Sequence, residues 1–197
     1  MRSSSEASGR GVRSRRMTRG LLVIDIQRDY FPGGALPLVE PEAAATATRQ
    51  LLDAFRTADE PILHLKHVWD APDATFMRPG TDGVELHPLV APAGGEPVLE
   101  KAAPNGFVGT GLEDEVRSRG IDELVVAGMM SSMCVDATVR AAADLGFSVT
   151  VVHDGCAAPD LRFGETDVPG AMVHAAFMAA LADGYAEVVA ADELLAG

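Results

Sequence analysis

The sequence predicts a three-layer α/β fold, in which a doubly wound sheet of six mainly parallel strands carries helices on both faces. Three observations predict it. Short, continuous apolar runs recur along the chain, which is typical of strands covered on both faces. Longer helical segments separate these runs, and this spacing favours right-handed parallel crossovers. The 197 residues are 47% hydrophobic, which suits one globular domain.

The strands are predicted from apolar runs bounded by turn residues. The first run has no polar–apolar alternation, so we expect it to be buried on both faces. Residues 69–96 separate the second and third strands with four prolines and four glycines, which predicts a long irregular loop of the kind that often carries function. In chain order, the expected strands are residues 20–26, 61–68, 97–101, 123–128, 147–152 and 187–189.

The helices are predicted from the segments between these runs. The first helix is rich in alanine and has Pro41 in its first turn, where proline is favoured. A later helix begins near Ser131 or Ser132 and runs to Leu145. No internal repeat or linker divides residues 20–197, so we expect one domain there. The expected helices are residues 41–58, 111–119, 131–145 and 168–182.

Residues 1–19 predict a disordered basic leader. They hold six arginines against one acidic residue, Glu6, and they have no apolar core of the kind a secretory signal needs. A mitochondrial presequence is similarly rich in Arg and Ser, but this stretch lacks the bulky apolar residues that an amphipathic helix would bury. Met17 is an alternative start, and we expect no chemistry from the leader.

The charge and the cysteine count exclude several classes of protein. The formal net charge is −13, and residues 20–197 carry ten basic against 28 acidic residues, which argues against a nucleic-acid partner. No run approaches the roughly 20 apolar residues of a membrane-spanning helix. Two cysteines, Cys134 and Cys156, are too few for a disulfide scaffold or a Cys-rich zinc site. We expect a cytoplasmic protein that acts on a small molecule, with no membrane partner.

Three reactive side chains lie at or just after the ends of predicted strands. Asp25 ends the first strand, Lys101 ends the third, and Cys134 lies in the first turn of the helix after the fourth. Ligands of such sheets bind at the carboxyl ends of the strands, so these side chains are expected at one edge. Taken singly, each has an ordinary explanation as a turn residue, a surface lysine or a small buried hydrophobe. Their joint placement favours catalysis.

These residues suit acyl transfer from an amide to water through a thioester. A cysteine at a helix N-terminus is a strong nucleophile, because the helix dipole can lower the thiol pKa to roughly 3.5–7.5. Asp25 can accept the thiol proton and return it to a leaving amine, and Lys101 can hold the thiolate or orient the carboxylate. The excess of acidic residues favours neutral or cationic substrates.

Further residues are candidates for substrate contact. Some follow Asp25 directly and are expected to orient it or to touch the substrate, and others are loop aromatics that can wall a pocket. A methionine cluster just before Cys134 would give soft, adaptable walls. Cys156, placed after the fifth strand, is predicted to be structural. The candidates are Gln27, Tyr30, Trp69, Phe76, Phe107, Met129, Met130 and Met133.

Three segments resemble, in order and spacing, those of the isochorismatase-like cysteine hydrolases. Residues 22–31, Leu-Val-Ile-Asp-Ile-Gln-Arg-Asp-Tyr-Phe, resemble the opening motif of that family. Lys101 with Asn105-Gly106-Phe107 resembles its lysine segment. Residues 128–140, Gly-Met-Met-Ser-Ser-Met-Cys-Val-Asp-Ala-Thr-Val-Arg, resemble its nucleophile segment, which is the most specific of the three. The resemblance covers residues 20–190.

The resemblance implies a catalytic triad of Asp25, Lys101 and Cys134, and a cis peptide bond between Met129 and Met130. It implies an oxyanion hole made by the N–H groups of Met130 and Cys134, and a homodimer or homotetramer in which a neighbouring loop can close the pocket. Members that cleave isochorismate generally lack the cysteine, so Cys134 indicates amide, lactam or ureido hydrolysis. The Gly33-Gly34 loop and the Met-Met-Ser-Ser-Met-Cys segment, residues 129–134, are similar to those of hydrolases of streptothricin-type lactams.

We expect no metal and no cofactor. Nicotinamidases of the family carry a metal-binding Asp-x-His and a further His after the second strand, and residues 66–72, Lys-His-Val-Trp-Asp-Ala-Pro, lack that pattern. His64 and His67 are three apart on a strand, so their side chains are expected on opposite faces. No Gly-x-Gly-x-x-Gly follows the first strand, so a dinucleotide site lacks its phosphate-binding turn.

Two alternative functions stay open at this point. In the first, the same fold hydrolyses an ether or another C–O bond and Cys134 is a bystander. In the second, the protein is a redox module whose Cys134 is reversibly oxidised. No resolving cysteine is expected beside Cys134, which makes the redox function the weaker alternative.

Overall fold

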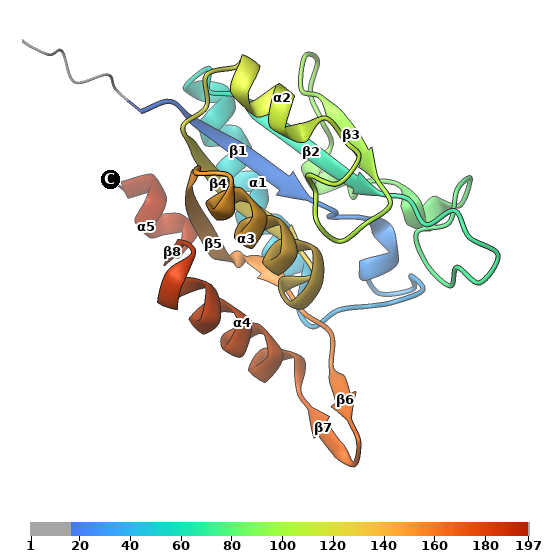
Figure 1. Ribbon diagram of the computed structural model, residues 1–197. Helices are drawn as coiled ribbons and strands as arrows, with labels where there is room; N and C mark the ends of the chain where they lie inside the picture. Colours follow the sequence, from blue (N-terminus) through green and yellow to red (C-terminus); the bar gives the residue numbers. More distant parts are fainter. Residues whose placement is uncertain (1–16, 197) are drawn as a thin grey trace, which may run out of the picture.

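The computed structural model describes residues 17–196 and has the expected three-layer α/β architecture (Figure 1). Its central sheet has six strands in the order β3-β2-β1-β4-β5-β8, and all neighbouring pairs are parallel. The order reverses between β1 and β4, which marks a doubly wound fold. The strands are β1 (Arg19–Ile24), β2 (Ile62–His67), β3 (Val98–Lys101), β4 (Glu123–Met129), β5 (Ser148–Ala157) and β8 (Glu187–Val189).

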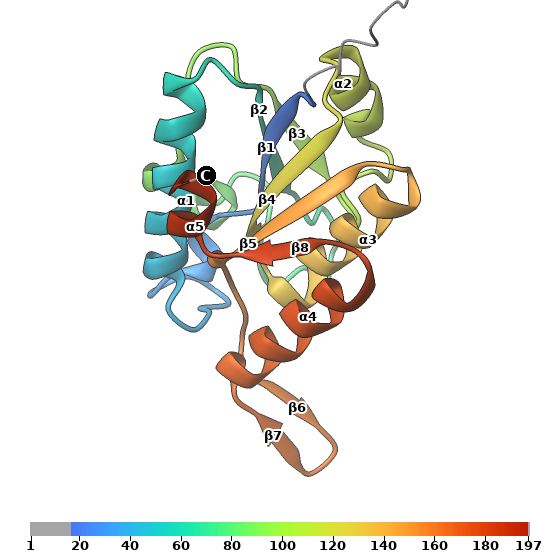
Figure 2. The ribbon, with the colours of Figure 1, turned by 90° about the vertical axis from the view of Figure 1, so that its left-hand side faces the viewer.

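Helices cover both faces of this sheet (Figure 2). Leu21 and Val23 of β1 pack into the core on the α1 side, and Leu22 and Ile24 pack into the core on the α3 side. The continuous apolar run of β1 therefore follows from having a core on each face. The helices are α1 (Pro41–Thr57) and α5 (Ala191–Ala196) on one face, and α2 (Leu112–Ser118), α3 (Asp136–Asp144) and α4 (Gly170–Gly184) on the other.

Three of the predicted boundaries were wrong. Arg19 was assigned to the leader but begins β1, where its side chain pairs with Glu60 at 2.9 Å; residues 1–16 of the leader lie outside the described residues. Cys156 lies inside β5 and not after it, because β5 continues through His153, Asp154 and Gly155 to Ala157. The helix expected from Ser131 begins instead as a π-helical turn, Ser131–Val135, and α3 follows it.

Two further elements were missed because they bury little apolar surface. The hairpin of β6 (Leu161–Phe163) and β7 (Thr166–Val168) projects from the body as an arm, and its residues are exposed except for the half-buried Val168 (Figures 1 and 2). The terminal helix α5 is only six residues long. Neither element has the apolar periodicity on which sequence prediction depends. Within residues 17–196, no helix has the length and apolar character needed to cross a membrane.

Gly128 allows β4 to approach β1 closely at the carboxyl edge of the sheet. A Cβ atom there would lie 2.1 Å from the Ile24 carbonyl oxygen, and the backbone φ of +150° is one that other residues rarely adopt. A side chain would therefore push the two strands apart at the point where each chain leaves the sheet. This contact places the turn after β4 next to the residue after β1.

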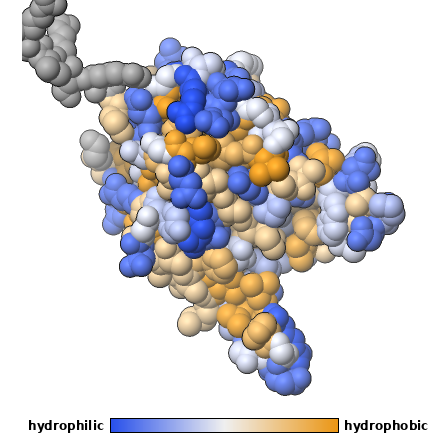
Figure 3. Space-filling model, in the orientation of Figure 1, coloured by the Kyte–Doolittle hydropathy of each residue, from blue (hydrophilic) through white to orange (hydrophobic). Residues whose placement is uncertain are grey.

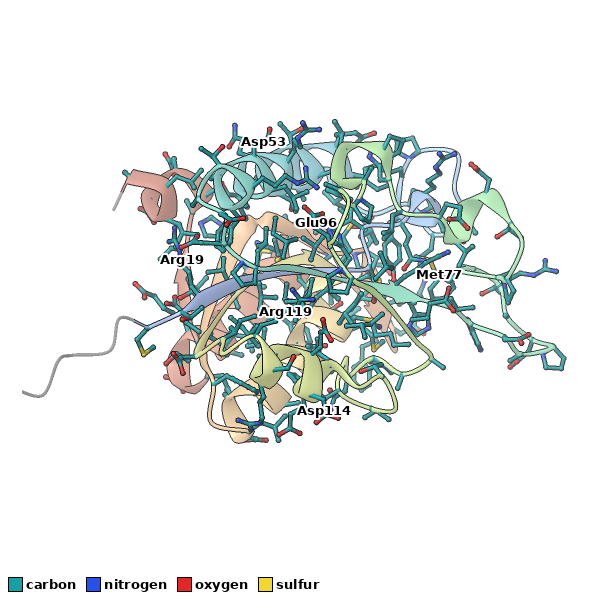
Figure 4. The ribbon with its side chains drawn as sticks, turned by 90° about the horizontal axis from the view of Figure 1, so that it is seen from above. Arg19, Asp53, Met77, Glu96, Asp114 and Arg119 are labelled. Atoms are coloured by element: carbon teal, nitrogen blue, oxygen red, sulfur yellow. The ribbon has the colours of Figure 1, made fainter. Side chains whose placement is uncertain are left out.

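Glu96 fastens the edge strand β3 to the rest of the fold. It lies just before β3 and between α1 and the sheet (Figure 4), and its side chain is 10% exposed. Arg56 of α1 donates hydrogen bonds to both carboxylate oxygens at 2.7 and 2.9 Å. The fully buried His64 of β2 lies 3.0 Å from Oε2, and the Ala93 N–H donates to the same oxygen at 2.8 Å. The position of β3, and so of Lys101 at its end, depends on this cluster.

We expect acid to weaken this anchor. Burial by itself raises the pKa of Glu96, but hydrogen bonds from Arg56, Ala93 and His64 lower it to about 2 from an ordinary 4.5. Because the folded-state pKa is the lower one, the stabilisation is present above pH 4.5 and is lost as pH falls towards 2. Across this window, wild type should lose up to about 3 kcal/mol of unfolding free energy more than Glu96→Gln, as measured by urea denaturation.

The control for this measurement is Glu85→Gln, because the Glu85 side chain is 54% exposed. That variant should follow the wild-type curve at every pH. A difference between wild type and Glu96→Gln that stays constant with pH would contradict the assignment of the effect to Glu96.

Candidate active site

The structure brings Asp25, Lys101 and Cys134 together at the carboxyl edge of the sheet. Lys101 Nζ lies 2.7 Å from Asp25 Oδ2 and 3.2 Å from Cys134 Sγ. The three residues are 0%, 3% and 4% exposed, respectively. A carboxylate, an ammonium and a thiol therefore share one nearly water-free space, in which their interactions are stronger than at a surface.

Each of the three side chains is positioned by a local feature of the backbone. Asp25 has a φ of 50°, which turns the chain out of β1 and differs from the strand conformation before it. Lys101 is the last residue of β3, and its register partner on β2 is His67. Cys134 lies in the π-helical turn, where the Met130 carbonyl accepts the N–H groups of Met133 and Val135 on either side of it.

His67 is a fourth member of the cluster that sequence reasoning did not select. Its Nδ1 lies 3.0 Å from Lys101 Nζ, and the Ala103 carbonyl accepts another hydrogen bond from the same ammonium at 3.0 Å. Burial and then the charge of Lys101 lower the pKa of His67, so the neutral ring accepts through Nδ1. The side chains of His64 and His67 were expected on opposite faces of the strand. The pairing of β2 with β3, which sets His67 opposite Lys101, decides that His67 is the one that joins the cluster.

The same atoms form a possible cation site. Ligand atoms of Asp25, His67 and Cys134 all lie within 4.8 Å of one another. Lys101 Nζ already lies within 3.2 Å of an atom from each of them, so its ammonium supplies the positive charge at this point. A metal ion would have to displace the Lys101 ammonium in order to bind there.

The expected low pKa of Cys134 was wrong. Burial, followed by the negative charge of Asp25, raises the pKa of the thiol to about 12, and Lys101 offsets only part of this effect. Cys134 lies in the π-helical turn that leads directly into α3. The resting residue is a thiol, and a base must remove its proton during attack.

Gln27 holds β2 in place. It is fully buried, and its amide nitrogen donates to the carbonyls of His67 at 2.8 Å and Val84 at 2.6 Å. Its Oε1 accepts the N–H of His67 at 2.8 Å. Both ends of the amide are therefore committed to backbone groups, and Gln27 fixes the end of β2 from which His67 projects.

The predicted aromatic and methionine candidates are divided between the two cores. Burial, and then the charges of Cys134 and Asp25, raise the pKa of Tyr30. Phe76 has its ring centre 6.2 Å from that of Tyr30 and 5.2 Å from that of Trp69, so these three rings form one aromatic wall. The buried Met129 and Met130 lie in the same core as Tyr30. Phe107 packs in the other core, with its ring centre 6.3 Å from that of Phe147. Met133 is 47% exposed.

The peptide bond between Met129 and Met130 is cis, as the resemblance implied. It lies between β4 and the turn that carries Cys134. Residues 19–193 match the description "Isochorismatase domain" among known protein families. The chain belongs to the isochorismatase family.

Members of the isochorismatase family resemble this chain along nearly all of its length. The family protein YddQ of Bacillus subtilis (strain 168) is 46% identical over 91% of this chain and 99% of its own length. A streptothricin hydrolase of Streptomyces noursei is 38% identical over 84% of this chain, and the match spans 60% of that enzyme.

Solved structures also resemble this chain over nearly all of its length. A crystal structure of the isochorismatase hydrolase type from Oleispira antarctica has a TM-score of 0.89 and 45% identity, and the match covers 93% of this chain and 99% of that one. N-carbamoylsarcosine amidase from Thermoplasma acidophilum has a TM-score of 0.74 and 27% identity, with 89% and 98% covered. The isochorismatase-like α/β fold is thereby established for this chain.

We expect Asp25→Asn to lower the pKa of Cys134. The substitution removes the negative charge that opposes the thiolate and leaves Lys101 in place, so the pKa should fall by about 1–3 units from its value near 12. The measurement is the ultraviolet absorbance of the thiolate against pH. It is made in a Cys156→Ser background, because burial raises the pKa of Cys156 to about 12 as well.

Glu100→Gln is the matched control, since Glu100 adjoins Lys101 in the sequence but its side chain is 66% exposed. It should leave the titration of Cys134 unchanged. An unchanged titration in Asp25→Asn would show that burial alone sets the pKa of the thiol.

Proposed function

We propose that this isochorismatase-family hydrolase cleaves a C–N bond of a small molecule through a thioester on Cys134. The bond would belong to an amide, a lactam or a ureido group. The observation that supports this function best is the cluster itself, in which one ammonium joins a carboxylate and a thiol at 2.7 and 3.2 Å. This set supplies a nucleophile, a proton acceptor and a fixed positive charge at one point, as nucleophilic acyl transfer requires.

In the first half of the proposed reaction, Cys134 Sγ attacks the substrate carbonyl carbon while Asp25 takes the thiol proton. A concerted transfer is consistent with the raised pKa of Cys134, since no resting thiolate is needed. The carbonyl oxygen becomes an oxyanion, for which we propose the N–H groups of Met130 and Cys134 as donors. The C–N bond then breaks, and the proton held by Asp25 passes to the leaving nitrogen.

In the second half, a water molecule attacks the thioester. Asp25 accepts the proton of the water, the C–S bond breaks, and the proton returns from Asp25 to sulfur. Lys101 stays charged throughout and stabilises the carboxylate and the departing thiolate. Its hydrogen bonds to His67 and the Ala103 carbonyl hold the ammonium in place during these steps.

The relatives support the choice of bond. The matched protein of Streptomyces noursei is named as a hydrolase of streptothricin. The matched structure from Thermoplasma acidophilum is named as an amidase of N-carbamoylsarcosine. For this chain we propose a streptothricin-type lactam as the first substrate to test. The formal charge of −13 favours approach of a cationic molecule of that kind. We also propose a cytoplasmic location, because both cysteines are free thiols.

The test is a panel of small amides, lactams and ureas, with released amine as the measured product. Cys134→Ala should lose about 10³-fold or more of the turnover, because no thioester can form. Asp25→Asn should lose a similar amount. Cys156→Ala is the matched control and should keep its activity, since Cys156 is the other buried cysteine and its Sγ contacts the Val152 carbonyl.

The other functions give different results in this panel. Retained turnover in Cys134→Ala, together with loss in Asp25→Asn, would indicate hydrolysis of an ether or another C–O bond with the cysteine as bystander. A stable sulfenate at Cys134 under mild peroxide, with no hydrolysis of any amide, would indicate a redox protein.

We also propose that copies of this chain form a homodimer or homotetramer through α4 and the arm of β6 and β7. Residues 170–182 of α4 contain no charged side chain, and apolar surface runs along α4 to the base of the arm (Figure 3). Phe163 on the arm is 87% exposed, and Met172 on α4 is 62% exposed. Copies that each carry a formal charge of −13 repel one another, so an uncharged face is where they can meet.

Phe163→Asp should therefore dissociate the oligomer. The charge would have to be buried without a partner at the contact, and the molar mass measured by light scattering should fall to that of a monomer. Val108→Asp is the control, because Val108 is an exposed apolar residue on another loop, and it should leave the mass unchanged. A wild-type protein that is monomeric at high concentration would exclude this proposal.

A further inference from the structure

A hydrogen bond from α4 reaches the turn that carries Cys134. Ser131, the first residue of the π-helical turn, is fully buried, and its Oγ lies 2.9 Å from Nδ1 of His174. His174 lies in α4 (Gly170–Gly184), which follows β5 and the arm in the chain. The cluster of Asp25, His67, Lys101 and Cys134 does not include His174, whose contact is with the side chain of the residue that begins the turn of the nucleophile.

Ser131 is well placed to control the geometry of Cys134. Its peptide group includes the Met130 carbonyl, which accepts the N–H of Met133 at 3.0 Å and the N–H of Val135 at 3.2 Å. Those two residues flank Cys134. Because the Met130–Ser131 peptide group is planar, the Met130 carbonyl and the Ser131 N–H move as one unit, so a restraint on Ser131 also restrains the turn that this carbonyl closes.

The surroundings of His174 suit a neutral hydrogen-bonding partner. Burial, and then the neighbouring His153, lower the pKa of His174, so the ring is uncharged at neutral pH. The His153 ring centre lies 6.4 Å away, and both rings line a hollow of about 240 Å³ that also meets Glu40 and Asp154. The ring therefore has open space beside it, and a side chain of similar size can replace it without crowding the core.

We propose that His174 is a positioning residue for the nucleophile: through Ser131 it holds the π-helical turn so that Cys134 Sγ and the N–H groups around it meet the substrate carbonyl in the reactive geometry. His174 contacts neither the thiol nor the substrate. This inference rests on the proposed function, because it assigns His174 to the attack by Cys134.

The test uses two substitutions of His174 that distinguish the role of Nδ1 from that of Nε2. Asparagine places a polar atom close to the position of Nδ1, whereas glutamine places its polar atoms near the position of Nε2. The measured quantity is the rate of the burst of nitrophenolate from p-nitrophenyl acetate, which reports acylation without any natural substrate. His174→Gln should slow the burst about tenfold, because a turn displaced by a fraction of an ångström misplaces the nucleophile. His174→Asn should restore most of the rate.

Ser131→Ala provides a second and independent variant. It removes the other half of the hydrogen bond and should slow the burst as much as His174→Gln does. The double variant should be no slower than either single one, because both substitutions break the same contact. Equal rates for His174→Asn and His174→Gln, or losses that multiply in the double variant, would overturn the proposal.

Two controls separate this inference from the proposed function. His153→Gln alters the same hollow without touching Ser131, and its burst rate and melting temperature should match wild type. Cys134→Ala should abolish the burst. A burst that survives in Cys134→Ala would refute the cysteine mechanism, whereas a Cys134-dependent burst that is unaffected by His174→Gln would refute only the role of His174.

Discussion

The buried ammonium of Lys101 is the constraint on which the rest of this site depends. Removing such a charge from water costs several kcal/mol unless it is paired and hydrogen-bonded. Here Asp25, His67, the Ala103 carbonyl and Cys134 surround Nζ at 2.7–3.2 Å. Three strands and one turn contribute these atoms, so the ammonium is satisfied only when the whole carboxyl edge of the sheet is assembled.

The backbone around the site provides that assembly. Gly128 lets β4 lie against the end of β1, since a Cβ atom would meet the Ile24 carbonyl oxygen at 2.1 Å. Gln27 uses both ends of its amide to fix the backbone of His67 at the end of β2. Glu96 fastens the edge strand that ends in Lys101 to α1 and β2. Fold stability and the positions of the reacting groups therefore depend on the same contacts.

The burial that positions these groups also determines their chemistry. A thiol that is 4% exposed and faces a carboxylate keeps its proton, and the pKa of Cys134 rises to about 12. The Asp25 carboxylate lies beside the same ammonium, and one of its oxygens is within 4.8 Å of Cys134 Sγ. Excluding water strengthens the attraction of Lys101 for the charge that develops on sulfur during the reaction. The raised pKa is thus compatible with a cysteine nucleophile that is activated only during attack.

The sequence by itself determined the six-stranded α/β fold and the order of its elements, because buried strands and helices leave apolar patterns that can be recognised locally. It also indicated Asp25, Lys101 and Cys134, since each lies at or just after the end of a strand. The arm of β6 and β7 left no such pattern, because its residues are largely exposed. Only the tertiary structure decided the roles of His67, Gln27 and His174 and the raised pKa of Cys134. These properties depend on strand register, on contacts between residues far apart in the chain, and on burial, none of which is a local property of the chain.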